Sequence, residues 1–381
     1  MPKNFQSLPL SEPSFWVKRH LERADIVIVG GGLVGLLTSI RLKEKFPKRE
    51  VWVLDQSPFL WSASWRNAGF ACYGSAGELI DEARRSSRSQ AIELYRRRFE
   101  GLVSLREEFG DAALGFEASG GWELFQTETE AQAVIQQLDE WNQDLKSVSG
   151  ISPFQIRSSQ SLGMRIASQA IFASQEGAIQ SHLLLRSVRN KAISLGVEYY
   201  EGQAVSHMEP TESHSWMLEL ESGLSLKARE LVLCTNAYTQ LLHEEVDLKP
   251  ARGQILVTSA MPDLSFRGIF HADQGYLYVR TLGTRLLLGG GRNLDFAKEE
   301  TLHSEENTAI RNHLLNYLKE VLVPGQEFSI QEQWSGIMAM GESREPIVQQ
   351  RAPGLYLAVR MGGMGVALSS EVAQGVSRLL S

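Results

Sequence analysis

The first strongly apolar stretch of the chain is a continuous run from Ile26 to Val29, built entirely from β-branched residues. Such a run predicts a strand buried on both faces, as in a parallel sheet, because a half-exposed strand would alternate apolar and polar positions. From Leu36 to Lys45 the apolar positions return at helical spacing, and a second buried strand is predicted over 51–54. The pattern therefore predicts a strand–helix–strand unit at the start of an α/β fold.

The rest of the chain alternates between helical patterns and short apolar strands. A long helix is predicted where apolar side chains repeat every three or four positions, at Ile92, Tyr95, Phe99, Leu102, Leu105 and Phe109. Further helices are predicted over 129–145, over 181–195 and at the C-terminus. Strands are predicted over 121–125, 230–235, 254–259, 276–281, 285–289 and 354–359. No linker or repeat divides these elements, which indicates two domains that interleave along the chain.

Composition and charge narrow the class of protein. With 381 residues, 43% of them hydrophobic and 22% charged, the chain resembles an ordinary globular enzyme of two large lobes. The net charge of −7 and pI of about 5.7 argue against nucleic acid or an anionic membrane surface as the partner. Cys72 and Cys234 are too few for a disulfide framework and lack metal-ligand spacing, so no metal is expected.

The ends of the sequence carry no targeting pattern. No apolar stretch approaches the ~20 residues that cross a bilayer, and residues 1–23 are polar and acidic where a signal peptide would be apolar. The chain is therefore expected to be cytoplasmic, without a membrane span. Residues 1–23 are expected to form an extension on the surface, anchored by Phe15 and Trp16.

Three glycines follow the first strand at the spacing GxGxxG: Gly30, Gly32 and Gly35. The first allows a tight turn, the second lets the backbone approach a pyrophosphate, and the third lets helix and strand pack closely. The phosphates would lie at the helix N-terminus, beside Leu33 and Val34, where free N–H groups and the helix dipole favour anions. Asp55 ends the second strand, where a carboxylate accepts hydrogen bonds from a ribose. The unit predicts an adenine dinucleotide; a glycine-rich turn without a ligand is the alternative.

Later segments match a known family. They are Ser62-Ala-Ser-Trp-Arg-Asn-Ala-Gly-Phe, Gly177-Ala-Ile, Leu231-Val-Leu-Cys-Thr-Asn-Ala-Tyr, Pro250-Ala-Arg-Gly-Gln, Leu287-Leu-Gly-Gly, Trp334-Ser-Gly and Met361-Gly-Gly-Met-Gly. From about Ala24 to the C-terminus the chain resembles the FAD-dependent D-amino-acid oxidase superfamily, in its branch of glycine oxidase, sarcosine oxidase and bacterial amine oxidases. The order and spacing of these matches are specific to the superfamily but not to a substrate.

The resemblance implies an α/β architecture in which a Rossmann-like FAD-binding domain is interleaved with a substrate domain built on a mixed, largely antiparallel sheet. The FAD-binding domain would comprise residues 24–90, 165–243 and 334–381. The substrate domain would comprise residues 91–164 and 244–333, and residues 1–23 would remain an extension.

The resemblance also implies which residues hold FAD beyond the first glycines. Ser64, Arg66 and Asn67 would reach the pyrophosphate and the flavin, although a polar surface turn is the alternative for this segment. The loop 361–366 would offer N–H groups to the flavin ring, unless it only docks the last helix. Val205 is assigned to the adenine by resemblance alone. The remaining positions implied as FAD contacts are Gln56, Ala68, Gly69, Thr235, Gly336, Met361, Gly362, Gly363, Met364, Gly365 and Val366.

Two positions depart from the family where a substrate would bind. Relatives that oxidise small amino acids usually have an arginine two places after Trp-Ser-Gly, suited to a planar carboxylate, and Met338 holds that place. Arg360 could restore the cation from another side, or it could form a structural ion pair. Glycine-like and sarcosine-like substrates are therefore in doubt.

Tyr276, Tyr278 and Arg280 alternate along one predicted strand and therefore share a face. That face is expected to line the substrate pocket; an exposed sheet face is the alternative. His271, just before this strand, is expected to be a satisfied core or surface histidine, and Cys72 an inert buried thiol. No residue is assigned as catalytic.

The expected function is that of a FAD-dependent oxidoreductase that dehydrogenates the CH–N bond of a small amine or amino acid and passes electrons to O2 or another acceptor. Arg66 stands where relatives attach flavin through histidine, and the segment 337–345 lacks their attaching cysteine, so FAD is expected to be noncovalent. A FAD-dependent 2-hydroxy acid dehydrogenase and a non-catalytic, flavin-loaded subunit of a larger complex are the alternatives.

Overall fold

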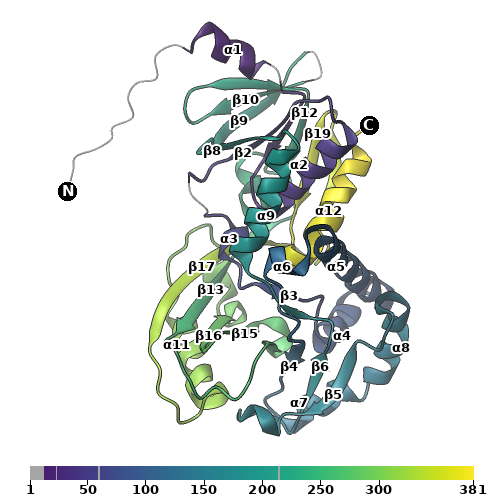
Figure 1. Cartoon of the computed structure of the whole chain (residues 1–381), viewed down its shortest axis with the longest axis vertical. Helices are drawn as coiled ribbons and strands as arrows, with labels where there is room; N and C mark the ends of the chain where they lie inside the picture. The colour runs from purple at the N-terminus through teal and green to yellow at the C-terminus, as the bar shows by residue number, and fades with distance from the viewer. Residues whose placement is uncertain (1–12, 23, 59–60, 213–214) are drawn as a thin grey trace, which may run out of the picture.

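Two large β-sheets occupy opposite ends of the molecule. The structure is a computed structural model, and it describes residues 13–22, 24–58, 61–212 and 215–381. A six-stranded sheet lies in the upper half of Figure 1, and an eight-stranded sheet lies in the lower half. This is the mixed α/β fold predicted from the sequence. Among the described residues, no helix combines the length and apolar character needed to cross a bilayer.

The six-stranded sheet is parallel except at one edge. Its order is β18 (Ile347–Ala352), β19 (Leu355–Val359), β12 (Glu230–Leu233), β1 (Ile26–Val29), β2 (Val51–Asp55) and β8 (Glu198–Glu201). Only β18 runs antiparallel to its neighbour. Strands β1 and β2 are buried along their whole length, because both faces of the sheet are covered. The continuous apolar runs predicted this arrangement correctly.

Different layers cover the two faces of this sheet. The helices α2 (Leu33–Lys45), α9 (Ser181–Ser194) and α12 (Gly365–Leu379) share one core with Ile26 and Ile28. On the other face, a three-stranded sheet of β9 (Val205–Pro210), β10 (Trp216–Leu220) and β11 (Ser225–Ala228) shares a second core with Val27 and Val29. Successive side chains of β1 therefore point alternately into the two cores on opposite faces of the sheet.

The eight-stranded sheet forms the other half. Its order is β17 (Ile330–Met340), β13 (Lys249–Thr258), β16 (Arg285–Gly290), β15 (Leu277–Leu282), β14 (Ile269–Ala272), β4 (Gly121–Glu123), β6 (Gln169–Ala173) and β5 (Phe154–Ser158). All neighbours are antiparallel except β14 and β4. Helix α11 (Thr308–Tyr317) buries Ile310 and Leu314 in the core of this sheet.

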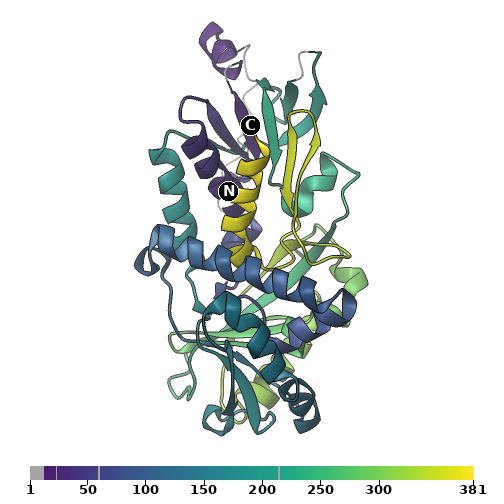
Figure 2. The ribbon, with the colours of Figure 1, turned by 90° about the vertical axis from the view of Figure 1, so that its right-hand side faces the viewer.

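The long helix α5 (Arg88–Phe109) lies at the junction of the two halves, where Figure 2 shows it running across the molecule. It packs against α12 on one side and against α4 (Ala76–Arg85) and α8 (Leu138–Ser149) on the other. The single helix predicted over 129–145 is instead two, α7 (Glu128–Ile135) and α8. The apolar positions keep helical spacing across the break, so periodicity could not locate it.

The sheets divide the chain differently from the expected domain boundaries at two places. Strand β6 falls inside 165–243, yet it pairs with β4 and β5 in the eight-stranded sheet. Residues 334–340 belong to β17 and pair with β13 in the same sheet. Both segments were expected in the FAD-binding domain. Strand pairing between distant segments fixed their place, and no local pattern reports such pairing.

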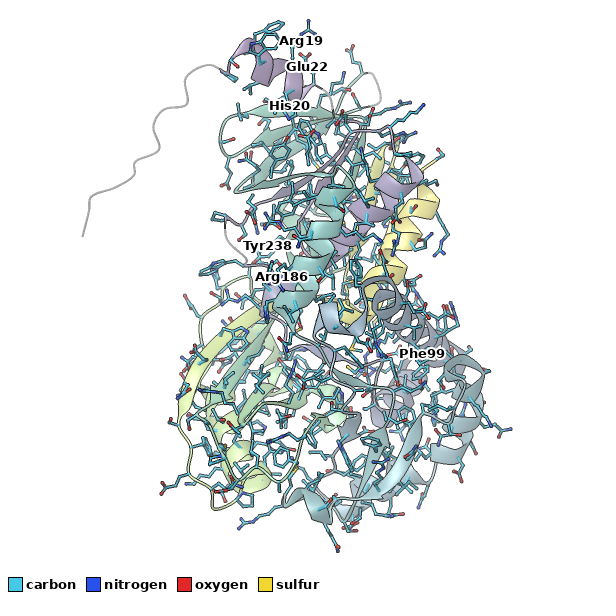
Figure 3. The ribbon with its side chains drawn as sticks, viewed as in Figure 1. Arg19, His20, Glu22, Phe99, Arg186 and Tyr238 are labelled. Carbon is cyan, nitrogen blue, oxygen red and sulfur yellow. The ribbon has the colours of Figure 1, made fainter. Side chains whose placement is uncertain are left out.

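The N-terminal extension is attached differently from the prediction. Helix α1 (Phe15–Leu21) projects at the top of the molecule, and Phe15 and Trp16 are 61% and 77% exposed, so neither anchors it. The contact comes from His20, which points toward the sheet in Figure 3. Its ring stacks on Trp52 with centroids 4.6 Å apart, and its Nε2 lies 2.7 Å from the Tyr200 hydroxyl. Residues 1–12 and 23 lie outside the described residues.

Candidate active site

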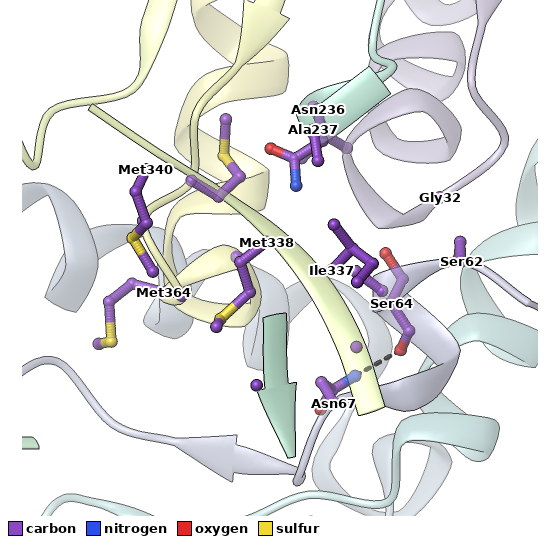
Figure 4. A pocket seen from close by; sticks show the side chains of 18 of the residues that line it. Gly32, Ser62, Ser64, Asn67, Asn236, Ala237, Ile337, Met338, Met340 and Met364 are labelled. Atoms are coloured by element: carbon purple, nitrogen blue, oxygen red, sulfur yellow. Dashed lines mark hydrogen bonds between the residues drawn. The ribbon is translucent and has the colours of Figure 1, made fainter. Parts of the chain in front are cut away.

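One cavity of about 1370 Å³ reaches both large sheets. The six-stranded sheet contributes the carboxyl ends of β1 and β2, and the eight-stranded sheet contributes parts of β13, β15 and β17. Figure 4 shows Gly32, Ser62 and Ser64 on one side of β17, with Met338, Met340 and Met364 on the other. The cavity therefore joins the predicted dinucleotide site to the predicted substrate residues.

The three glycines of the first turn have separate structural roles. A Cβ added to Gly30 would lie 2.6 Å from the Cys234 carbonyl oxygen, and one added to Gly35 would lie 1.9 Å from the Gly30 carbonyl oxygen. These two glycines permit close packing of β1, α2 and β12. A Cβ on Gly32 would meet only serine side-chain atoms, the nearest being Ser64 Oγ at 3.0 Å. Gly32 is therefore the glycine that leaves room in the cavity for a ligand.

Asp55 lies at the end of β2, on the cavity wall, and is 8% exposed. Its Oδ2 accepts a hydrogen bond from the Gly31 N–H at 2.7 Å, and its Oδ1 accepts one from the Ser57 N–H at 2.8 Å. Burial raises the pKa of the Asp55 carboxyl, although these two hydrogen bonds oppose the shift. The carboxylate is thus held in place by the backbone, and each oxygen retains capacity to accept a further bond.

The short helix α3 (Ala63–Arg66) and the residues around it form the wall beside Gly32. Ser64 Oγ accepts from the Leu33 N–H at 2.9 Å, and the Asn67 amide donates to the Ser64 carbonyl oxygen. Asn67 Oδ1 in turn accepts from the Gly69 N–H at 2.8 Å. The guanidinium of Arg66 lies over the Trp61 ring, 5.0 Å from its centroid. Asn67 therefore organises the loop, and Arg66 brings a positive charge to the cavity.

The loop 361–366 closes the opposite wall. Gly362 and Gly363 have φ values of +57° and +83°, which turn the chain sharply into α12. No side chain of the described residues caps α12, and its first residues, Gly365, Val366 and Ala367, line the cavity. A helix of fifteen residues also carries the positive end of its dipole here.

The cavity fits FAD by its unsatisfied polar atoms as well as by its shape. Ser62 Oγ and Asn236 Oδ1 both belong to cavity-lining residues, and both are buried without a hydrogen-bond partner among the described residues. Buried polar atoms are nearly always paired, so these atoms point to a missing polar ligand. Neither residue was predicted from the sequence, although both stand inside quoted family segments.

Nineteen of the predicted FAD positions line the cavity: Gly30, Gly32, Leu33, Val34, Asp55, Gln56, Ser64, Arg66, Asn67, Ala68, Val205, Thr235, Gly336, Met361, Gly362, Gly363, Met364, Gly365 and Val366. Gly35 and Gly69 do not. Gly35 packs under Gly30, as its predicted role in helix packing requires. Gly69 lies against Ile179 and Arg280, one layer behind the wall.

Tyr276, Tyr278 and Met338 line the cavity as predicted for a substrate pocket. Strand β15 begins only at Leu277, so Tyr276 lies in the preceding turn. Met338 Cε and the Tyr278 hydroxyl both border the space above Gly253, at 3.0 and 3.6 Å from the place of a Cβ there. Burial raises the pKa of Tyr278, so its phenol stays neutral and keeps its O–H donor.

Arg280 lies outside the cavity wall, contrary to the prediction. It is 2% exposed, and its Nη1 donates to the carbonyl oxygens of Gly69 and Ile179 at 2.7 Å each and of Ala68 at 3.2 Å. It shares the face of Tyr278 but meets the backbone of the other half instead of open space. Arg280 therefore connects the eight-stranded sheet to residues 68–69, at the end of the segment around α3 that was predicted to contact FAD.

Arg360 also lies outside the cavity wall, contrary to the expected pocket position. Its Nη1 pairs with the Asp247 carboxylate, and its Nε donates to the Glu345 carbonyl oxygen at 2.9 Å. The sequence left two roles open for Arg360, a cation for the substrate and a structural ion pair. Its contacts are those of a structural ion pair. Its φ of +65° is uncommon for a residue with a side chain.

Cys72 and His271 line the cavity together, near Glu176. Their ligand atoms all lie within 4.8 Å of one another, and His271 Nε2 lies 3.7 Å from Glu176 Oε2. Burial alone would lower the pKa of His271, but the nearby Cys72 and Glu176 outweigh it and raise the pKa well above the usual value. His271 Nε2 is nevertheless buried without a hydrogen-bond partner among the described residues, so the expectation of a satisfied histidine is wrong, and the sequence could not place the thiol and the carboxylate beside it.

Comparisons with known proteins identify the family and the fold. The family model described as FAD dependent oxidoreductase matches residues 25–379. The probable oxidoreductase OrdL of Haemophilus influenzae is 21% identical over 99% of this chain and 86% of its own. L-proline dehydrogenase from P. horikoshii is 16% identical, and glycine oxidase from Geobacillus kaustophilus is 20% identical. Each of these two structures superimposes with a TM-score of 0.75 and covers 94% of both chains.

The two structures share the fold of this chain, and the family model extends over nearly all of its length. The glycine turn, Asp55 and the loop 361–366 all line the cavity between the two sheets. The chain belongs to the FAD dependent oxidoreductase family.

Proposed function

We propose that this protein binds FAD noncovalently and dehydrogenates the CH–N bond of a small amine or amino acid. The observation that carries the proposal is the single cavity that runs from Asp55 in one sheet to Tyr278 in the other. A substrate lying against Tyr278 and Met338 would thus share a chamber with the cofactor. The names of the structural neighbours, a proline dehydrogenase and a glycine oxidase, support an amino acid or a related amine.

Different parts of the cavity wall suit the ribose, the pyrophosphate, the adenine and the flavin ring of FAD. Asp55 would accept hydrogen bonds from the ribose, and the N-terminus of α2 at Gly32 would face the pyrophosphate. Val205 is proposed beside the adenine, and the loop 361–366 beside the flavin ring. Bound FAD supplies the two-electron acceptor that protein side chains lack.

The chain's own residues would prepare the cavity for hydride loss. N–H groups at the start of α12 and the dipole of that helix stabilise negative charge that develops near Gly363. Met338 and Met340 present apolar surface on one face of β17 and would keep water from the reacting carbon. The substrate nitrogen must be neutral, because C–H donates hydride and N–H releases a proton when the C=N bond forms.

Met338 is proposed to set the limit on small substrates. Its thioether occupies the place where relatives that oxidise small amino acids have an arginine, and Met cannot pair with a carboxylate. Glycine, sarcosine and D-alanine are therefore expected to be poor substrates.

The test is reduction of the bound flavin under anaerobic conditions, measured as the loss of the flavin's visible absorbance. The purified, FAD-loaded protein is mixed with primary amines, secondary amines, amino acids and 2-hydroxy acids of matched size. At least one amine or amino acid should reduce the flavin, and the 2-hydroxy acid of the same carbon skeleton should not.

Reduction by 2-hydroxy acids alone would contradict the proposal and favour a hydroxy acid dehydrogenase. A stably bound flavin that no compound reduces would instead support a non-catalytic subunit. Efficient turnover of glycine or D-alanine would overturn the role given to Met338.

A further inference from the structure

Arg292 lines the cavity without an acidic partner. It follows β16 directly, and no carboxylate of the described residues lies within 4.0 Å of its guanidinium. Burial lowers the pKa of Arg292, and the nearby Arg344 and Arg85 add to this effect. A partly buried cation without a counter-charge is costly, so its retention at a cavity wall points to an anion supplied from outside.

The acids of α4 are already engaged by other arginines. Arg344 Nη2 lies 2.9 Å from Asp81 Oδ2, and its Nη1 lies 3.2 Å from Glu82 Oε2. Asp81 also pairs with Arg85. A further acid of the same helix, Glu78, pairs with Arg98 at 3.0 Å. The acids of α4 are therefore matched by other cations, and none of them pairs with Arg292.

Two aromatic rings lie beside the guanidinium of Arg292. The guanidinium carbon lies 5.1 Å from the Tyr276 ring centroid and 5.2 Å from that of Phe296. The two rings stand at 74° to each other, and each offers a cation–π contact to the guanidinium. No hydrogen bond to a described residue occupies its N–H donors, which have the fork geometry that matches a carboxylate.

The backbone on both sides of Arg292 is fastened to the turn that carries Tyr276. The Gly291 N–H donates to the Tyr276 carbonyl oxygen at 2.7 Å, and Asn293 Nδ2 donates to Asp273 Oδ2 at 2.7 Å. Asp273 and its neighbour Gln274 have φ values of +50° and +53°, an uncommon conformation for residues with side chains. Such strain persists where a site requires it, and here it positions the two partners of Arg292.

We propose that Arg292, between Tyr276 and Phe296, binds a carboxylate of the substrate. One uncompensated positive charge matches one carboxylate, and the exposed Phe296, at 50%, offers apolar surface beside it. This assignment rests on the proposed function for the reaction but places the anion at Arg292, away from Met338 and from the paired Arg360. The substrate class is then an amine that bears a carboxylate.

The experiment measures binding, not turnover. FAD-loaded protein is titrated by calorimetry with phenylacetate and with phenylacetamide, which share a shape and differ in charge. Wild type should bind phenylacetate at least tenfold more tightly than the amide. Arg292→Met should remove that preference and leave amide binding unchanged, and Arg292→Lys should retain part of it. FAD content and the thermal midpoint of each variant verify folding.

Arg311→Met is the matched control. Arg311 is a half-buried arginine of the same lobe that pairs with Glu306 at 3.4 Å and lies outside the cavity wall. It should bind phenylacetate as wild type does. Equal binding of acid and amide by wild type, or an undiminished preference in a folded Arg292→Met or Arg292→Lys protein, would overturn the proposal.

The outcome is separable from that of the proposed function. If the protein binds phenylacetate through Arg292 but no amine reduces its flavin, the carboxylate site is supported and the proposed reaction is refuted. If amines with and without a carboxylate reduce the flavin equally well, the reaction is supported and the carboxylate site is refuted.

Discussion

Substituting alanine at Gly32 or at Gly35 adds one methyl group and should distinguish a glycine that leaves room for a ligand from a glycine that is required for packing. At Gly35, the added Cβ of alanine would lie 1.9 Å from the Gly30 carbonyl oxygen, which is part of rigid backbone. Van der Waals contact needs about 3.2 Å, so the turn or the helix must shift by more than 1 Å. Overpacking of this kind costs about 1–3 kcal/mol or more, which exceeds the ~1 kcal/mol that alanine gains over glycine inside a helix.

At Gly32 the same methyl meets little of the protein. Its φ of −73° suits any residue, and its closest neighbour is the Ser64 hydroxyl at 3.0 Å, which can rotate away. The flavin-free protein should therefore lose less than about 1 kcal/mol, mostly from a poorer helix cap. The methyl would, however, project toward the proposed place of the pyrophosphate. A penalty of about 1–3 kcal/mol on binding corresponds to a 5- to 150-fold weaker affinity for FAD.

The assay compares Gly32→Ala and Gly35→Ala in two measurements. Denaturant unfolding of the flavin-free proteins should be nearly normal for Gly32→Ala and clearly destabilised for Gly35→Ala. FAD titration, followed by flavin fluorescence, should show the large loss for Gly32→Ala. Wild-type FAD affinity in Gly32→Ala would refute the placement of the pyrophosphate. Wild-type stability in Gly35→Ala would refute the packing argument.

Other predictions concern the remaining charged groups and the cofactor link. Asp55→Asn should weaken FAD binding about tenfold or more, since a charge-assisted bond contributes about 1.5–3 kcal/mol, and it removes the acceptor of one of the two N–H groups of Gly31 and Ser57. Asp55→Ala removes both acceptors and should destabilise the flavin-free fold further; titration and unfolding distinguish the two. Because burial raises the pKa of Asp55, its folded form takes up a proton at a higher pH than its unfolded form. Lowering the pH through the range between the unfolded and the folded pKa of Asp55 should weaken FAD binding and slightly stabilise the flavin-free protein. Asp55→Asn should show neither pH dependence. FAD should leave the polypeptide on heat or acid denaturation, and flavin that remains attached to the precipitated chain would contradict noncovalent binding. Arg360→Met should lower the unfolding free energy by about 1–3 kcal/mol, through its lost bonds to Asp247 and nearby carbonyl groups, and should not change the affinity for phenylacetate.

The sequence alone determined the dinucleotide end of the site. Gly30, Gly32, Gly35 and Asp55 lie within one strand–helix–strand unit, whose geometry follows from local periodicity and short-range sterics. The continuous apolar runs also reported burial on both faces, because a strand covered on each side can be polar on neither. These inferences needed no contact between distant segments, and the structure agrees with them.

Only the tertiary structure decided what each arginine does. Arg280, Arg292 and Arg360 have the same chemistry, and no local pattern distinguishes them. Arg360 meets Asp247, which is 113 positions away, and Arg280 meets a loop carbonyl 211 positions away, whereas within the described part of the chain Arg292 contacts aromatic rings and no acid. Whether a cation is available to a ligand depends on the acid or carbonyl that the fold brings to it, and such pairing arises between segments that the sequence keeps far apart.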